Sequence, residues 1–335
     1  MINGYAAMRA GGTLQPYQFA AATLGPSEIE IAISHCGICH SDLHLLDNDW
    51  GVSSYPLVPG HEIIGTVSRL GTEVAQLRQG QRVGVGWLAG SCMACEQCLS
   101  GNENLCRRSQ PTCIGRPGGY ASHVRVDARF AAAVPDVLAS ESAAPLLCAG
   151  ITVFAPLQRQ KLKPASRVGV IGLGGLGHLA AQCAKAMGFE VTVFSTSAHK
   201  QDEAYSFGAD RFVDSHAGGA LSGAAGSCDM ILTTAPVDLS WPEYLNLLKP
   251  NGHLCIVGAS PGEVRVPAFA LIDGQKSIGG SAVGSNGDIA EMLQFAAAHK
   301  IAPRIEPFAL KNVNDALARL RHNRVRYRAV LVMDS

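Results

Sequence analysis

The stretch Arg167-Val-Gly-Val-Ile-Gly-Leu-Gly-Gly-Leu-Gly-His178 decides the fold class of this chain. Its apolar run Val168 to Ile171 predicts a buried strand, and the alanine-rich sequence that follows predicts a helix to about Met187. The glycines between them allow a tight turn and a close approach of the backbone to a pyrophosphate at the helix N-terminus. Because Glu190 to Phe194 predicts the next strand, the motif lies in a βαβ unit, which favours a dinucleotide site over a merely flexible turn. The predicted cofactor residues of this turn are Gly172, Leu173, Gly174, Gly175, Leu176 and Gly177.

The end of the second strand indicates which dinucleotide binds. An NAD site usually has Asp or Glu there to hold the ribose 2′-hydroxyl, but this sequence continues Ser195-Thr-Ser-Ala-His-Lys200. The hydroxyls of Ser195, Thr196 and Ser197 and the ammonium of Lys200 suit a 2′-phosphate, which a carboxylate would repel. The alternative is an ordinary polar helix start, because Ser and Thr are good caps. We predict NADP(H) rather than NAD(H), and expect loss of Lys200 to weaken NADP binding while leaving NAD binding nearly unchanged.

Strand and helix patterns continue to alternate after this unit. Met230 to Leu232, His253 to Val257 and Ser277 to Gly280 predict strands, and Leu239 to Leu248 predicts a helix. We therefore predict an α/β fold in which residues 149–285 form a Rossmann domain with a doubly wound parallel sheet.

The first third of the chain has a different pattern. Glu28 to Ser34, His61 to Leu70 and Gly80 to Trp87 are strand-like, with many glycines and prolines between them. This pattern predicts a compact β domain over residues 1–148.

The end of the chain is expected to return to that β domain. Asp288 to His299 predicts a helix and Ala329 to Met333 a strand, so residues 286–335 would complete the first domain. The alanine-rich segment Pro135 to Pro156 predicts a crossover helix that carries Cys148.

Half of a zinc site is present near residue 40. Cys39 offers a thiolate, His61 an imidazole and Glu62 a carboxylate, which are all zinc ligands. A catalytic zinc takes three protein ligands and keeps one open position, so a further ligand must come from elsewhere, and Cys148 is the candidate. The alternative for each residue alone is a buried apolar cysteine or a core histidine.

Two pairs of side chains could complete such a site. Ser41 and His44 place a hydroxyl and an imidazole beside Cys39, which indicates a path for a proton. Trp50 and Trp87 could line an apolar pocket, or they could be ordinary packing residues.

A second cysteine group has the spacing of a closed metal site. Four thiolates at this spacing can surround a zinc ion and leave no coordination position for a substrate, which predicts a structural zinc. A redox C-x-x-C would need a thioredoxin-like context, and a nucleic-acid zinc ribbon would need a more basic surround. The four residues are Cys92, Cys95, Cys98 and Cys106.

Composition restricts the partners and the compartment. The 335 residues are 47% hydrophobic and 16% charged, with 27 Lys plus Arg against 27 Asp plus Glu, so no overall charge favours nucleic acid or an anionic membrane. No secretory signal and no uninterrupted span of about 20 apolar residues is evident. The 11 cysteines cluster at metal-ligand spacing rather than as disulfide staples. We expect a cytoplasmic protein that acts on a small molecule and binds neither nucleic acid nor membrane.

Four motifs together resemble the zinc-dependent medium-chain alcohol dehydrogenases, and within them the cinnamyl alcohol dehydrogenase-like branch. The motifs occur in that family's order and at similar spacing over nearly the whole chain. They are Cys-Gly-Ile-Cys-His-Ser-Asp at 36–42, Pro-Gly-His-Glu at 59–62, the four-cysteine loop, and Gly-Leu-Gly-Gly-Leu-Gly-His at 172–178.

The resemblance implies a role for each matching residue. Catalytic zinc would be held by Cys39, His61 and Cys148, with Glu62 as an adjacent or alternate ligand, and Cys36 would lie outside the ligand set. The loop Cys92, Cys95, Cys98 and Cys106 would hold structural zinc. The resemblance also places His40 against the cofactor pyrophosphate, Ser41 and His44 in the proton relay, Asp42 behind the ligands and Thr152 near the cofactor.

The implied protein has a GroES-like β domain and a Rossmann domain, carries two zinc ions per chain and forms a homodimer. It would transfer a hydride between NADP(H) and a primary alcohol or aldehyde. The segment from Cys106 to Cys148 is shorter than in plant members, so the resemblance does not define the substrate. The alternatives are an NAD-linked polyol or secondary-alcohol dehydrogenase and, more remotely, a non-catalytic zinc and dinucleotide redox sensor.

Overall fold

The structure is a computed structural model that describes residues 1–259 and 262–333. It divides into two compact units, one made of Met1–Ile151 with Val283–Ser335 and the other of Thr152–Ala282. The sequence analysis expected the boundaries after residue 148 and before residue 286.

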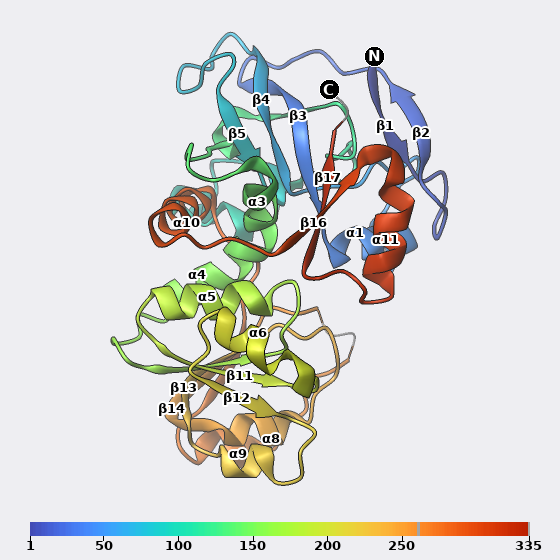
Figure 1. Cartoon of the computed structure of the whole chain (residues 1–335). Coiled ribbons are helices and arrows are strands. Elements are labelled where there is room, and N and C mark those ends of the chain that lie inside the picture. The colour runs from blue at the N-terminus through green and yellow to red at the C-terminus, as the bar shows by residue number, and fades with distance from the viewer. Residues whose placement is uncertain (260–261, 334–335) are drawn as a thin grey trace. The chain divides into compact units, whose positions relative to one another are not determined.

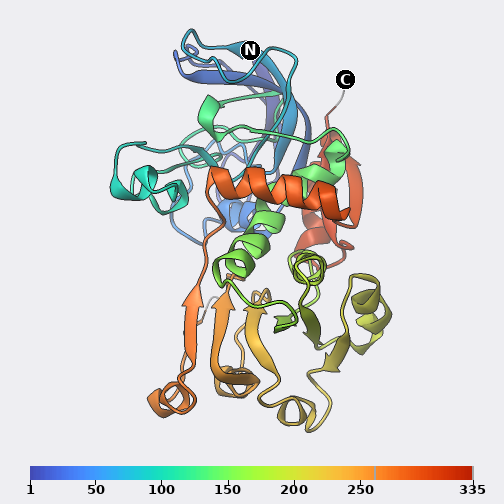
Figure 2. The same ribbon diagram turned by 90° about the vertical axis from the view of Figure 1, so that its left-hand side faces the viewer.

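The second unit is built on a six-stranded parallel sheet. Its strand order, β12-β11-β10-β13-β14-β15, is the 3-2-1-4-5-6 order of a doubly wound dinucleotide fold, which confirms the predicted fold class. Figure 2 shows the later strands, gold to orange, lying side by side. The strands are β10 (Arg167–Ile171), β11 (Glu190–Ser195), β12 (Arg211–Asp214), β13 (Cys228–Thr233), β14 (Leu248–Ile256) and β15 (Ser277–Gly280).

The central strands of this sheet are apolar on both faces because helices follow them in the chain. Val170 and Ile171 of β10, and Val193 and Phe194 of β11, are adjacent pairs whose side chains point to opposite faces of the sheet. All four are buried, as expected for a parallel sheet covered on both sides. The helices are α5 (Gly177–Ala186), α6 (Gln201–Ser206), α7 (Ala220–Gly223), α8 (Trp241–Asn246) and α9 (Ala268–Ile272), with a short turn η4 (Ala198–Lys200) before α6.

The first unit is organised around a seven-stranded, mainly antiparallel sheet. Burial alternates along its longest strand, β3 (Glu28–Ile38), so Ile29, Ile31 and Ile33 face the core. The other strands are β4 (Ile63–Leu70), β5 (Arg82–Val85), β8 (His123–Asp127), β9 (Ala132–Ala133), β16 (Ile305–Ala309) and β17 (Arg328–Val332). The C-terminal strand β17 pairs antiparallel with β3 (Figure 1). In this pairing Leu331 lies opposite Cys36.

Helices and short hairpins surround this sheet. α10 (Asn286–His299) contacts β9, and α11 (Val313–Arg321) contacts β17. Two small ladders join β1 (Ile2–Ala6) to β2 (Gln15–Phe19) and β6 (Leu88–Gly90) to β7 (Gln110–Pro111).

The predicted crossover helix is one continuous helical run with an irregular centre. It consists of α3 (Ser140–Pro145), a π-helical turn η3 (Leu146–Gly150) and α4 (Ile151–Arg159). By length and hydropathy alone the run Ser140–Arg159 could cross a membrane, but 83% of its apolar window is buried inside the protein, as is common for a core helix.

Candidate active site and metal centres

The helix α1 (His40–Asp47) orders the residues near position 40, and the sequence analysis did not predict it. Cys39 is its N-cap residue, with an extended backbone, and the Cys39 N–H donates to Asp42 Oδ2 at 2.9 Å. The first turn therefore fixes Cys39 where β3 ends and brings Ser41 Oγ to 3.6 Å from Cys39 Sγ.

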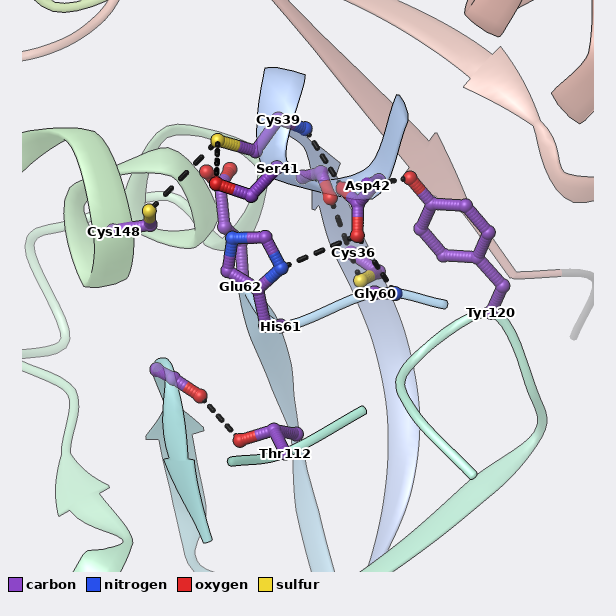
Figure 3. A network of polar contacts seen from close by, with 12 residues as sticks. Cys36, Cys39, Ser41, Asp42, Gly60, His61, Glu62, Thr112, Tyr120 and Cys148 are labelled. Carbon is purple, nitrogen blue, oxygen red and sulfur yellow. Dashed lines mark hydrogen bonds and ion pairs between the residues drawn. The ribbon is translucent and has the colours of Figure 1, made fainter. Parts of the chain in front are cut away.

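Four candidate ligands from three places in the chain meet in one buried cluster (Figure 3). The ligand atoms of Cys39, His61, Glu62 and Cys148 all lie within 4.8 Å of one another, and the two Sγ atoms are 3.9 Å apart. Two thiolates on one tetrahedral zinc, with Zn–S bonds of about 2.3 Å, would be roughly 3.8 Å apart. His61 Nε2 and Glu62 Oε2 are buried and have no hydrogen-bond partner among the described residues. The cluster fits a metal ion in both spacing and donor chemistry.

The other nitrogen of His61 is held by a carboxylate. His61 Nδ1 lies 3.2 Å from Asp42 Oδ1, so Nδ1 is the protonated nitrogen and Nε2 is directed to the cluster. Asp42 is itself fixed by the Gly60 N–H at 3.0 Å and the Tyr120 hydroxyl at 3.1 Å. Burial opposes the imidazolium, but the charges of Asp42 and Cys148 outweigh it and raise the pKa of His61 well above its ordinary value.

Sequence reasoning missed the partner of Glu62. The Arg328 guanidinium, completely buried at the start of β17, donates to Glu62 Oε1. Burial raises the pKa of Glu62 to about 7, although Arg328 opposes that shift. The one available signal was an arginine at the start of an otherwise apolar strand, and this observation alone does not identify a partner 266 residues away.

The two candidate relay residues lie one turn apart on α1. Ser41 is next to Cys39, and His44 Nδ1 is 2.7 Å from Asp49 Oδ2. Asp49 was also missed, because an exposed acid after a helix has no special pattern. The Trp50 ring stacks on His44 with ring centroids 5.1 Å apart.

The two tryptophans form an aromatic series between His44 and His61. The Trp87 ring packs edge-on against the His61 ring, with ring centroids 4.9 Å apart, and edge-on against the Trp50 ring, with centroids 6.2 Å apart. Trp50 is 40% exposed and Trp87 is half-buried. Trp87 therefore borders the metal cluster, Trp50 extends the aromatic series to His44, and both rings remain partly exposed.

The four cysteines of the second group also meet. Their Sγ–Sγ distances are 3.5 Å (Cys95 to Cys98 and Cys92 to Cys106) and 3.8 Å (Cys92 to Cys98 and Cys95 to Cys106). Hydrogen bonds reach the sulfurs from outside: Ser91 Oγ lies 3.2 Å from Cys98 Sγ, and the Arg108 N–H donates to Cys106 Sγ at 3.3 Å. This set is close to a tetrahedron of thiolates and leaves no position for a substrate.

The remaining cysteine of the first motif lies elsewhere. Cys36 is a residue of β3 that is completely buried in the core, and its thiol lies 3.6 Å from the Gly37 carbonyl. Burial raises the pKa of the Cys36 thiol well above its ordinary value, so it stays protonated. Cys36 is not one of the four residues of the ligand cluster.

The glycine-rich loop has the shape that a pyrophosphate requires. Gly172 has φ +89°, and a Cβ on Gly177 would lie 1.9 Å from the Gly172 carbonyl, so neither position accepts a side chain. No atom lies within 4 Å of a Cβ on Gly174, which leaves that side of the loop open. The loop fits a dinucleotide on the N-terminus of α5.

The predicted 2′-phosphate residues differ in accessibility. Thr196 is exposed and Ser197 is half-buried, whereas Ser195 is buried and its hydroxyl accepts the Ser197 N–H at 3.2 Å. Lys200 Nζ donates to the Leu173 carbonyl at 2.8 Å. The remaining predicted cofactor residues are His40, half-buried at the start of α1, and Thr152, buried in α4.

Both units match families of known proteins. Residues 25–136 match the alcohol dehydrogenase GroES-like domain, and residues 175–298 match the zinc-binding dehydrogenase family. An aldehyde reductase, AdhA, of Synechocystis sp. is 44% identical over 331 residues, which is 99% of this chain and 98% of the relative.

Two solved structures of cinnamyl alcohol dehydrogenases are similar along the whole chain. The Sorghum bicolor enzyme is 41% identical with a TM-score of 0.96, over 99% of this chain and 97% of that one. The Helicobacter pylori enzyme, solved with NADP(H), is 34% identical with a TM-score of 0.92 over the same shares.

Proposed function

The chain belongs to the zinc-dependent medium-chain alcohol dehydrogenases, in their cinnamyl alcohol dehydrogenase-like branch, and we propose from this that it is an NADP-dependent aldehyde reductase and alcohol dehydrogenase. It transfers a hydride between NADP(H) and a primary alcohol or aldehyde. The observation that carries this function is the buried cluster of Cys39, His61, Glu62 and Cys148. In it, His61 Nε2 and Glu62 Oε2 have no hydrogen-bond partner among the described residues.

Two zinc ions per chain are proposed. Cys39, His61 and Cys148 would hold the catalytic ion, with Glu62 beside it, and Cys92, Cys95, Cys98 and Cys106 would hold the structural ion. Two observations support this proposal: the ligand atoms within each set are close enough to bind one ion, and the two sets differ in the number of ligands. Three protein ligands leave one coordination position of zinc open, whereas four thiolates leave none.

The side chains around the first cluster have separate tasks. When bound there, zinc supplies Lewis acidity that favours loss of the alcohol proton. Ser41 receives that proton through its hydroxyl and passes it toward His44, whose ring Asp49 orients. Asp42 holds the His61 ring through Nδ1, and Arg328 neutralises Glu62 so that its carboxylate stays near the ligands without an uncompensated charge.

NADP(H) is the proposed cofactor. The exposed Thr196 and half-buried Ser197 and Lys200 lie where a 2′-phosphate would be recognised, and no described acid occupies the end of β11. The bound nicotinamide supplies or accepts the hydride. NADPH dependence favours reduction of aldehydes.

The substrate side is proposed to be apolar. Trp87 lies edge-on to His61, and Trp50 extends the aromatic surface outward. A flat or extended apolar aldehyde would bury its tail against these rings while its oxygen reaches the metal ligands.

An aldehyde panel tests the proposed function. Zinc-loaded protein should oxidise NADPH, followed by absorbance, with aromatic and medium-length aliphatic aldehydes and more slowly with acetaldehyde. Cys39→Ser should abolish this activity, while Cys36→Ser, which changes a buried cysteine outside the cluster, should keep it. No NADPH oxidation with any aldehyde would rule out the reductase.

A homodimer is proposed on the free edge of the parallel sheet. β15 is the end strand of the six-stranded order, and α9, which precedes it, exposes Phe269 (72%) and Ile272 (68%). An unpaired edge beside exposed apolar side chains is typical of an interface with a second copy. Light scattering should give twice the chain mass, and changing both Phe269 and Ile272 to Glu should give monomers.

A cytoplasmic location is also proposed. All 11 cysteines are free, and both ligand clusters bring thiols within 3.9 Å. Such pairs keep their metal-binding form in a reducing compartment, whereas an oxidising one would favour disulfides. A fractionation experiment that recovers the protein outside the cytoplasmic fraction would contradict this location.

A further inference from the structure

Two side chains form hydrogen bonds to consecutive carbonyl groups of the glycine-rich loop 172–177. Lys200 Nζ donates to the Leu173 carbonyl at 2.8 Å. His178 Nδ1 lies 3.0 Å from the Gly174 carbonyl, which also accepts the His178 N–H at 3.2 Å. Because a carbonyl oxygen only accepts, His178 carries its proton on Nδ1 in this contact.

These contacts set the direction of the N–H groups that a pyrophosphate would use. In a planar trans peptide the N–H points opposite to the preceding C=O. Fixing the carbonyls of Leu173 and Gly174 therefore fixes the N–H groups of Gly174 and Gly175. In the described part of the chain these two N–H groups have no backbone acceptor, and the Cβ position of Gly174 faces open space. The donors are thus oriented before a ligand arrives.

Both hydrogen bonds depend on the segment that follows β11. Lys200 belongs to η4, directly after the predicted 2′-phosphate residues. The buried His178 ring packs edge-on against Phe207 at the end of α6, with centroids 5.3 Å apart. The segment 198–207 therefore supports the glycine-rich loop at both points.

We propose that Lys200 and His178 are positioning residues that hold this loop in its diphosphate-binding conformation. Lys200 then contributes to affinity for the diphosphate that NADP(H) and NAD(H) share, and not only to recognition of the 2′-phosphate. The proposal rests on the dinucleotide site of the proposed function and differs from the sequence-based expectation that loss of Lys200 leaves NAD binding unchanged.

Two nucleotide fragments separate the two roles of Lys200. ADP has the diphosphate without a 2′-phosphate, and adenosine 2′-monophosphate has the reverse. Their dissociation constants would be measured by calorimetry on the whole, zinc-loaded protein for wild type, Lys200→Met and His178→Phe. Lys163→Met, which removes an exposed lysine of the same unit, is the matched control.

In Lys200→Met, ADP should bind roughly 5- to 20-fold more weakly, the range for loss of a charged hydrogen bond. His178→Phe should weaken ADP roughly 3- to 10-fold and leave adenosine 2′-monophosphate within about twofold, since one neutral hydrogen bond to the loop is lost. His178→Gln, which keeps a donor, should recover most of the ADP affinity, and this variant also serves if Phe prevents folding. Lys163→Met should change neither constant.

Unchanged ADP affinity in Lys200→Met, with weaker adenosine 2′-monophosphate binding, would overturn the proposal, because Lys200 would then act on the 2′-phosphate alone. If wild type binds ADP but not adenosine 2′-monophosphate, the NADP assignment fails, and the positioning role is then decided by the ADP results alone.

Discussion

His44 Nδ1 and Asp49 Oδ2 lie 2.7 Å apart, so the imidazole at the end of the proposed relay has a carboxylate behind it. A carboxylate accepts the Nδ1 proton and leaves Nε2 as the nitrogen that can take up or release a proton. Trp50 stacks on the same ring and limits its rotation. The relay is therefore a hydroxyl and an oriented imidazole on one helix.

Changes in the relay should reduce turnover and spare cofactor binding. Ser41→Ala should lower kcat by about 10²-fold or more, in the range of a lost general acid or base. Asp49→Asn should cost less, roughly 10-fold, because His44 remains but loses its orientation. The dissociation constant of NADPH, followed by fluorescence, should stay within about twofold. The control is Asp47→Asn on the same helix, whose carboxylate pairs with Arg321, and near-normal turnover of Ser41→Ala would show that solvent reaches the substrate directly.

The two metal clusters should separate activity from stability. Elemental analysis should find two zinc ions per chain in freshly purified protein, and one or none would contradict the assignment. Cys39→Ser should abolish turnover with little change in the thermal midpoint, whereas Cys92→Ser should mainly lower that midpoint, because a closed thiolate site contributes directly to folding. Equal loss of folding in both variants would refute the division of roles.

Cofactor preference should respond to one side chain at the end of β11. Thr196→Asp should shift preference from NADP to NAD, because a carboxylate there repels a 2′-phosphate and accepts hydrogen bonds from the free ribose hydroxyls. Each effect is expected to be at most a few kcal/mol. The measurement is kcat/KM with both cofactors in wild type and variant. A wild type that already prefers NAD, or a ratio that does not move, would show that this strand end does not select the cofactor.

A partly buried ion pair should give the β domain a defined acid sensitivity. The Arg125 guanidinium donates to Glu30 Oε2 through Nε at 2.8 Å and Nη2 at 2.5 Å, and both side chains are only 12% exposed. Burial raises the pKa of Glu30, but the hydrogen bonds and charge of Arg125 outweigh it and lower that pKa below the ordinary 4.5.

Because the pKa of Glu30 is lower in the folded state, its stabilising effect is present above pH 4.5 and is lost as pH falls through the folded-state value. At pH 7 the free energy of unfolding of Glu30→Gln, measured by denaturant titration, should therefore be about 1–3 kcal/mol lower than that of wild type. This difference should disappear at acidic pH. Glu190→Gln, at an ion pair more than half exposed, should have little effect at either pH. A constant difference between wild type and Glu30→Gln at all pH values would exclude the ionic origin.

The sequence was informative where chemistry or periodicity is local. The unit β10-α5-β11 could be predicted because apolar runs and glycines follow each other within 30 residues, and Ser277–Gly280 was placed without error as β15. The strand β12 was missed, since Arg211-Phe-Val-Asp is a short edge strand with little apolar pattern. The helix α1 was missed because the His and Asp residues that serve the site interrupt its apolar face.

Two hydrogen-bond partners from distant parts of the chain could not be predicted from the sequence. Glu62 could be named as a candidate ligand because it follows His61. Arg328 could not be paired with Glu62, because the sequence around residue 328 contains no metal-binding motif. The same holds for Tyr120 on Asp42. Strand pairing and burial bring these groups together, and both are properties of the folded chain.

The π-helical turn Leu146–Gly150 determines the direction of the Cys148 thiol. A π turn accommodates one residue more than an α turn, and each residue rotates a helix by about 100°. Deletion of Ala149 would let the run close as a regular α-helix and would rotate Cys148 relative to the residues after it by less than about 100°. The position of Cys148, the third ligand of an open metal site, therefore depends on one extra residue in this helix. A chain that lost that residue could keep the apolar pattern of the helix and still lose the metal site.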